Sequence, residues 1–245
     1  MLFRSNARLN GLEAEFVVGS LYAPVAGRRF DRIVAQPPYV SQAPGLADVK
    51  ILYGGPFGDE LALRFVADAP AALAPGGEGL FMFESAVRKG VPLHGRLGPM
   101  LQGTTTDLVL LTHPGAPSDL EAVLFASQDA ADLGTEYVQS LRRRWEHFQT
   151  LGVEEFQSVL AVLRGHPAGA ARDGAVLASR VGTFRHGNPA ALAGLLAGAA
   201  LLRSSDPALA AATLSLADGA VWQEERAPGA DEVRRTLVFP AGIAA

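Results

Sequence analysis

The segment Phe30–Tyr39 constrains the fold of this chain more than any other stretch of its sequence. Its first six residues, Phe-Asp-Arg-Ile-Val-Ala, are typical of a β-strand with branched side chains at its centre. The next four, Gln-Pro-Pro-Tyr, cannot continue a central strand, because proline has no amide hydrogen to donate to a neighbouring strand. We therefore predict that a strand over residues 30–35 ends in a sharp turn, called the Gln36–Tyr39 turn below.

Residues 1–165 alternate between stretches that favour strands and stretches that favour helices. The sequence predicts further strands at 13–18, 79–84, 107–112 and 156–163, and helices at 1–12 (ending at Gly11), 59–73, 93–102 and 135–151. This alternation is typical of an α/β fold with a mostly parallel sheet. The strands are apolar throughout, which favours a sheet covered on both faces, as in a three-layer sandwich.

The helix expected at 135–151 shows the clearest periodicity. Tyr137, Leu141, Trp145 and Phe148 fall on one stripe, which we expect to face the core. The three arginines of Arg142–Arg144 lie beside this stripe and are expected to face mostly solvent.

The composition changes after residue 165. Residues 166–189 show no clear periodicity and are interpreted as a linker, followed by helices at 192–202 and 207–213 and by strands of a small hairpin at 220–223 and 236–239. The sequence therefore divides into a catalytic-type domain over 1–165 and a linker with a small α+β tail over 166–245.

The composition also excludes several kinds of protein. Of the 245 residues, 49% are hydrophobic and 19% charged, so the chain can build a sizeable core. A net charge of −4 gives no global positive field for nucleic acid, which leaves only a local basic groove for that purpose. The longest apolar run, residues 190–202, is too short for a membrane span, and no signal peptide is recognisable. We expect no membrane partner and a cytoplasmic location.

Metal and covalent chemistry find no support in the sequence. There is no cysteine, and the five histidines have no metal-ligand spacing, so no metal site is predicted. Ser85 and Ser158 lack the glycines of a nucleophile elbow, which argues against a hydrolase.

The Gln36–Tyr39 turn offers another chemistry. Ligands of open α/β sheets bind beyond the carboxyl ends of the strands, where this turn is expected to lie. The Gln36 amide and the carbonyl groups beside the prolines can accept hydrogen bonds, and Tyr39 offers a flat face. Acceptors that hold the two hydrogens of a planar nitrogen favour a more nucleophilic geometry, and in-line positioning of a methyl donor contributes up to about 7–11 kcal/mol.

This turn resembles the Asn-Pro-Pro-Tyr signature of class I S-adenosylmethionine-dependent methyltransferases that act on amino groups. They include release-factor glutamine methyltransferases, N6-adenine methylases and ribosomal-RNA guanine-N2 enzymes. The resemblance extends over residues 1–165, through the segments Asn6–Leu12, Gly19–Val25, Gly54–Leu61 and Leu73–Gly77. It implies a Rossmann-like methyltransferase sandwich whose substrate is a protein, such as a translation factor, or RNA.

The resemblance also implies a role for each residue of the turn. Gln36 and the Pro37 carbonyl would hold the amino group, Pro38 would shape the loop, and Tyr39 would stack on the substrate. Gln36 departs from the family pattern, because the family has Asn or Asp there and Gln is one methylene longer.

By the same resemblance, S-adenosyl-L-methionine is the cofactor, and Ser20 and Leu21 would border its adenine. The glycine-rich loop of the family precedes the position of Met1, so we expect an amino-terminally incomplete sheet. Because the first two strands of the family lie between those expected at 13–18 and 31–35, these two strands must pair directly or leave apolar faces open. A second chain could supply the absent loop.

Two other functions remain open at this stage. The chain could be an inactive or truncated methyltransferase remnant, or a module whose Pro-Pro-Tyr pocket and tail bind RNA or a protein without chemistry. Arg142–Arg144 could touch RNA phosphates, although a run of charges on a helix is usually a solvated face. The glycines of Gly54–Gly58 lack the Lys-Ser/Thr of a phosphate-binding P-loop, which favours an ordinary flexible loop.

Overall fold

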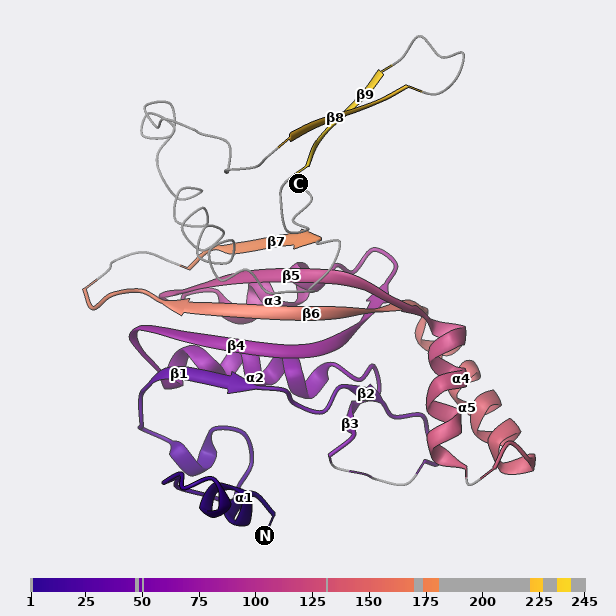
Figure 1. The fold of residues 1–245 in the computed structure, drawn as a ribbon, viewed down its shortest axis with the longest axis horizontal. Coiled ribbons are helices and arrows are strands. Elements are labelled where there is room, and N and C mark those ends of the chain that lie inside the picture. The colour runs from indigo at the N-terminus through magenta and orange to yellow at the C-terminus, as the bar shows by residue number, and fades with distance from the viewer. Residues whose placement is uncertain are drawn as a thin grey trace.

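A five-stranded sheet forms the body of the protein (Figure 1). The computed structural model describes residues 2–46, 49, 51–130, 132–169, 174–180, 221–226 and 233–238. The strand order is β1 (Phe30–Ala35), β4 (Leu73–Arg88), β6 (Val153–Gly165), β5 (Thr106–Pro117) and β7 (Val176–Arg180). β1 is parallel to β4 and β5 to β7, whereas β6 is antiparallel to both its neighbours. All strands of this sheet except β6 therefore run in one direction, which confirms the predicted α/β fold with a mostly parallel sheet.

The remaining described elements are helices and two smaller pairs of strands. The helices are α1 (Leu2–Leu9), the 3-10 turn η1 (Ala23–Val25), α2 (Glu60–Ala72), α3 (Leu93–Leu101), α4 (Ser118–Asp129) and α5 (Thr135–Leu151). Two short strands, β2 (Val40–Ser41) and β3 (Tyr53–Gly55), pair beyond the end of β1. The hairpin of β8 (Val221–Arg226) and β9 (Val233–Val238) is antiparallel, which confirms the expected tail hairpin.

Helix α4 was not predicted. Its buried positions include the small residues Ala122 and Ala126, whereas Leu120 and Leu124 are 48% and 49% exposed. The large apolar residues thus lie on the exposed side, so the sequence shows no apolar stripe of the usual helical period.

The strand expected at 13–18 is absent, and Val18 is 96% exposed. Among the described strands, β1 pairs only with β4 and forms the edge of the sheet. From the sequence, this strand is expected either to pair with residues 13–18 or to leave an apolar face exposed. The apolar face is exposed, since Val34 on β1 is 71% exposed. Charged Asp31 and Arg32 on the same strand oppose edge-to-edge association.

The division of the chain at residue 165 stays a prediction. Strand β7 lies inside the stretch interpreted as a linker, yet it pairs with β5 and extends the main sheet. The helices expected at 192–202 and 207–213 lie outside the described residues.

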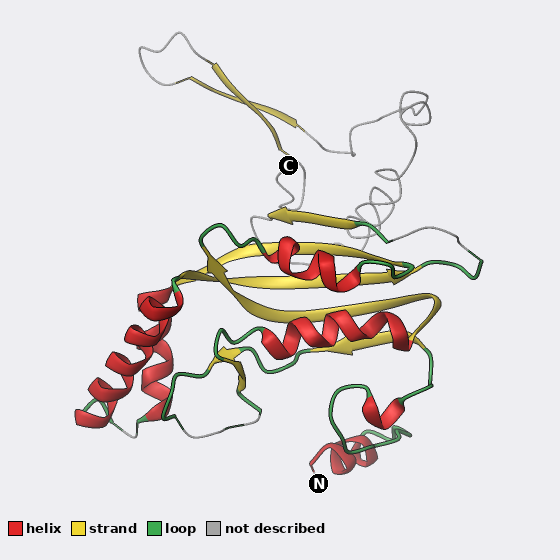
Figure 2. Cartoon of the chain, turned by 180° about the vertical axis from the view of Figure 1, so that it is seen from behind, coloured by secondary structure: helices red, strands yellow, loops and turns green. Residues whose placement is uncertain are grey.

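The main core lies between the sheet and the helices α2 and α3, which cover the same face (Figure 2). Leu108 and Leu110 of β5 point into this core, and the alternating Val109 and Leu111 form a smaller cluster on the opposite face. On that opposite face Met82 is 58% exposed. Near the carboxyl end of β4 this opposite face is covered by α4 and α5, whose Ala122 and Phe148 pack against Ala86 of β4 and Phe156 of β6.

Helix α5 has the predicted bounds but buries a different stripe. Ser140, Arg144 and Phe148 are buried, and Trp145, expected in the core, is 48% exposed. Arg144, expected to face solvent, is 1% exposed because Asp129 of α4 accepts hydrogen bonds from its Nε and Nη2 at 2.7 and 2.9 Å. Burial acts to raise the pKa of Asp129, but hydrogen bonds from Arg144 and Ser140 hold it below its usual value.

The Arg144–Asp129 pair yields a stability prediction. Arg144→Met removes the charge and leaves Asp129 in a mostly buried site, so the free energy of unfolding should fall by about 3–5 kcal/mol. Urea unfolding followed by circular dichroism measures it. Arg142→Met is the matched control, because Arg142 and Glu146 are 3.6 Å apart with side chains 80% and 61% exposed, and its effect should stay below about 1 kcal/mol. Equal losses in the two variants would contradict the prediction.

Candidate active site

The Gln36–Tyr39 turn lies where β1 ends, at the carboxyl edge of the sheet, as predicted (Figure 1). Gln36 is exposed, Pro37 is buried, and Pro38 and Tyr39 are half-buried. Tyr39 packs against the main core. The turn thus presents the Gln36 side chain to solvent while its prolines and tyrosine are fixed by packing.

The backbone of Gly54–Gly58 rests directly against this turn. A Cβ on Gly54 would lie 2.5 Å from the Pro38 carbonyl oxygen, and a Cβ on Gly58 would lie 2.8 Å from the amide nitrogen of Ser41. Gly58 also has φ +93°, a conformation that glycine adopts readily. These glycines, interpreted from sequence as ordinary loop residues, are therefore required for a close backbone approach.

Hydrogen bonds fix the same contact. The amide of Val40 donates to the Leu52 carbonyl at 3.1 Å, and that of Gln42 donates to the Gly55 carbonyl at 2.9 Å. The Ser41 hydroxyl donates to the Pro56 carbonyl at 2.5 Å. The segment after the turn is consequently ordered by the glycine loop that follows it.

Helix α5 contacts both the segment after the turn and the loop around Gly54–Gly58. Arg144 donates from Nη1 to the Ser41 carbonyl at 3.4 Å and from Nη2 to the Tyr53 hydroxyl at 3.2 Å. Arg143 donates to the Gly45 carbonyl at 3.2 Å, and His147 Nε2 donates to the Pro56 carbonyl at 2.9 Å. Arg143 and Arg144, considered earlier for RNA phosphates, instead bind backbone carbonyls of residues 41 and 45 in this structure.

A buried polar cluster lies beneath the loop. Asp59, Ser85 and Arg96 come from the start of α2, from β4 and from α3, and we call them the Asp59–Ser85–Arg96 cluster. The Ser85 hydroxyl and Arg96 Nη1 donate to Asp59 Oδ2 at 2.6 and 2.7 Å, and Arg96 Nη2 donates to the Ser85 hydroxyl at 2.7 Å. Sequence reasoning missed this cluster; its one signal was Arg96, a charge among the apolar positions of a helix.

Arg88 adjoins this cluster at the end of β4. Its guanidinium carbon lies 4.0 Å from the centroid of the Phe57 ring, and the Phe57 amide donates to Glu60 Oε1 at 2.9 Å. Burial lowers the pKa of Arg88, and the neighbouring charge of Arg96 lowers it further. The loop therefore meets charged groups of both signs at the carboxyl edge.

Ser20 and Leu21 lie before η1. Leu21 has φ +49°, and Tyr22 beside it donates from its hydroxyl to the Phe65 carbonyl at 3.1 Å, where burial and then Asp68 raise the tyrosine pKa. Ser20 is exposed, and the described residues show no hydrogen bond from it or Leu21 to the Gln36–Tyr39 turn. Their role beside an adenine stays a prediction.

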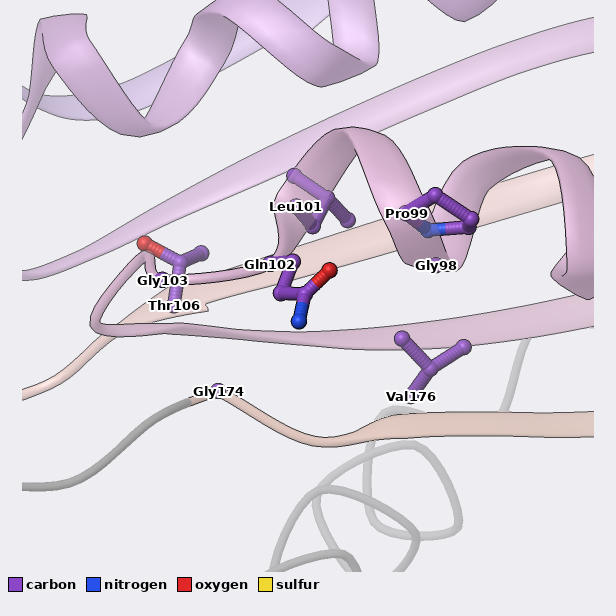
Figure 3. A pocket seen from close by; sticks show the side chains of 8 residues that line it. All are labelled: Gly98, Pro99, Leu101, Gln102, Gly103, Thr106, Gly174 and Val176. Carbon is purple, nitrogen blue, oxygen red and sulfur yellow. The ribbon is translucent and has the colours of Figure 1, made fainter.

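A cavity of about 360 Å³ lies at the end of the sheet where β5 begins, and Figure 3 shows the residues that line it. Its lining includes Leu101 and Gln102 of the α3 end, Thr106 at the start of β5, and Val176 of β7. It has no charged lining residue. Because β1 and β5 run in the same direction, the start of β5 and the carboxyl end of β1 lie at opposite ends of the strands. The cavity is therefore separate from the predicted site.

Within the described residues, no group of three or more His, Asp or Glu side chains could hold a metal ion. Nor does any described helix combine the length and apolar character that crossing a membrane requires.

An α/β sheet with a proline-stiffened polar turn at the carboxyl edge of a strand is the arrangement that the methyltransferase resemblance implies. Over 84 residues the chain is 44% identical to a release factor glutamine methyltransferase of Deinococcus radiodurans. This match covers 31% of the chain and 30% of that relative, and it confirms the resemblance to methyltransferases of this type. The chain thus spans less than a third of the relative's length.

No family model matches the chain. Among solved structures, a methyltransferase homolog protein from Pyrococcus horikoshii aligns with a TM-score of 0.30 and 16% identity, over 66% of this chain and 48% of that one.

The close approach of the glycine loop leads to a second prediction. Gly58→Ala would place a methyl group against the Tyr39 carbonyl and in an unfavourable backbone conformation, so it should lower the free energy of unfolding by about 2–4 kcal/mol. Gly98→Ala in α3 is the control, since a Cβ there meets nothing within 4 Å, and its stability should rise by about 0.5–1 kcal/mol. A Gly58 variant as stable as wild type would contradict the packing argument.

The buried carboxyl of Glu121 leads to a third prediction. Burial, then the nearby charge of Glu84, raises its pKa from 4.5 to about 7, with Arg144 opposing. The folded chain thus holds this proton more tightly than the unfolded chain, so the stabilisation is complete below pH 4.5 and is lost as the pH rises through about 7.

Glu121→Gln removes the titrating carboxyl group. The free energy of unfolding of this variant should therefore decline less than that of wild type between about pH 4.5 and pH 8. Urea unfolding at several pH values measures the difference, with exposed Glu154→Gln as the control. Parallel pH profiles for the Glu121 variant and wild type would refute the assignment.

Proposed function

We propose that this chain transfers a methyl group from S-adenosyl-L-methionine to a planar amide or amino nitrogen of a protein or RNA substrate. The observation that supports it is the Gln36–Tyr39 turn, which stands at the carboxyl end of β1 with its backbone fixed by the glycine loop. The partial identity to a release factor glutamine methyltransferase makes a protein glutamine the first substrate to test.

Each residue of the turn has a role in this proposal. The Gln36 carbonyl, exposed at the sheet edge, and the Pro37 carbonyl accept hydrogen bonds from the substrate nitrogen. Pro38 fixes the turn against Gly54, and the exposed part of Tyr39 stacks on the planar group. S-adenosyl-L-methionine, when bound, supplies an activated methyl group, and these residues orient the accepting nitrogen.

The described residues fit the cofactor only in part. Ser20 and Leu21 would border the adenine, but neither is joined to the turn by a hydrogen bond in the described structure. No strand among the described residues pairs with the outer side of β1, and a further element there, such as a loop of a second chain, would complete the cofactor contacts. Because the described residues fit the cofactor only in part, an inactive methyltransferase remnant is the second candidate function.

Calorimetric titration of the purified chain with S-adenosylmethionine and S-adenosylhomocysteine tests cofactor binding. We expect a dissociation constant in the micromolar range, which is about −8 kcal/mol. A chain that is folded by circular dichroism and binds neither compound would favour the remnant instead.

Methyl transfer tests the role of Gln36. With tritium-labelled S-adenosylmethionine and a bacterial release factor, Gln36→Ala should reduce the rate by about 100-fold, because a hydrogen bond to the reacting nitrogen is lost. Gln102→Ala, at the cavity where β5 begins, is the matched control and should keep the wild-type rate. An equal rate for the Gln36 variant would exclude its proposed role, and labelling of RNA instead of protein would reassign the substrate.

A further inference from the structure

We propose that Asp59, held by Ser85 and Arg96, is a positioning residue for the Gln36–Tyr39 turn. This inference rests on the proposed function, because it assigns the cluster beneath the loop a part in orienting the groups that hold the substrate nitrogen.

Asp59 occupies the N-cap position of α2 but does not cap the helix with its side chain. An aspartate at this position ordinarily accepts a hydrogen bond from an amide of the first helical turn. Here the side chain turns away, is 1% exposed, and receives hydrogen bonds from Ser85 on β4 and Arg96 on α3. The residue that begins α2 is therefore fixed by the sheet and by a second helix.

The fixed residue controls the backbone next to it. Gly58 precedes Asp59, and its α-carbon lies so close to the Tyr39 carbonyl and the Ser41 amide that a Cβ would overlap them. The Gly58 amide donates to the Gly55 carbonyl at 3.0 Å, which transmits the same constraint along the loop. A shift of Asp59 would thus move the surface on which the turn rests.

Stability alone does not explain the cluster. Asp59 Oδ1 and Arg96 Nε are buried with no hydrogen-bond partner among the described residues, and so is Glu60 Oε2 beside them. Buried polar atoms without partners cost free energy, and apolar side chains of similar size often stabilise such a site. The Asp59–Arg96 ion pair therefore costs stability, because some of its polar atoms have no hydrogen-bond partner. A role in positioning the loop that it contacts accounts for this cost.

The experiment compares Asp59→Asn with wild type in the methyl-transfer assay with labelled S-adenosylmethionine and release factor. Asn keeps the shape and removes the charge, so kcat should fall about tenfold while KM for S-adenosylmethionine changes less than about twofold. Amide hydrogen exchange should accelerate at residues 36–42 and 54–58 and stay unchanged in β5 and β6. Arg96→Lys, which keeps the charge, should retain more activity than Arg96→Gln.

Asp68→Asn is the matched control on the same helix, since Asp68 and Arg64 form an exposed pair 3.6 Å apart. It should leave kcat and exchange unchanged. Ser85→Ala removes the two hydrogen bonds of the Ser85 hydroxyl, to Asp59 and from Arg96, and keeps the ion pair. It replaces Asp59→Asn if that variant does not fold, with an expected fall in kcat of about threefold.

A wild-type kcat in Asp59→Asn, or an exchange increase spread over the whole sheet, overturns the proposal. If wild type labels no substrate, the proposed function fails separately, and exchange then decides the positioning role. Acceleration confined to residues 36–42 and 54–58 supports that role, and unchanged exchange there rejects it.

Discussion

The contact between the Gly54–Gly58 backbone and the Gln36–Tyr39 turn is the constraint on which the candidate site depends. Two backbones meet there without side chains between them, and a single methyl group would overlap carbonyl or amide atoms. Protein interiors accommodate so small a change only by moving the backbone. The orientation of the turn is therefore set by the loop that follows it as well as by the strand that precedes it.

Charged residues hold this contact from both sides. Arg144, with Asp129, fixes Ser41 and Tyr53 from the helix pair α4 and α5, and Arg96 fixes Asp59 from α3. Both arginines are buried against a carboxylate, so each is costly in isolation and acceptable only as part of its pair. The loop thus takes its shape from tertiary contacts, because glycine has little conformational preference of its own.

Local patterns were sufficient to predict the elements that depend on local rules. The strand ending at Ala35 and the helix ending at Leu151 were predicted because proline stops the strand and Gly152, with φ +65°, ends the helix. The burial of Arg144 and exposure of Trp145 were missed, because the partner Asp129 belongs to a helix that has no apolar stripe. The Ser85–Asp59 contact joins residues 26 positions apart, which no periodicity can indicate.

The position of β6 has a consequence for how the molecule folds. β6 lies between β4 and β5, and Met82 of β4 pairs with Leu160 of β6, far along the chain. Pairings of such high sequence separation form slowly, since the intervening chain loses its freedom before the contacts stabilise it. Helix α5, which holds the loop after the turn, leads directly into β6. We therefore expect the contacts that α5 makes with the segment after the turn to form late in folding, when β6 enters the sheet between β4 and β5.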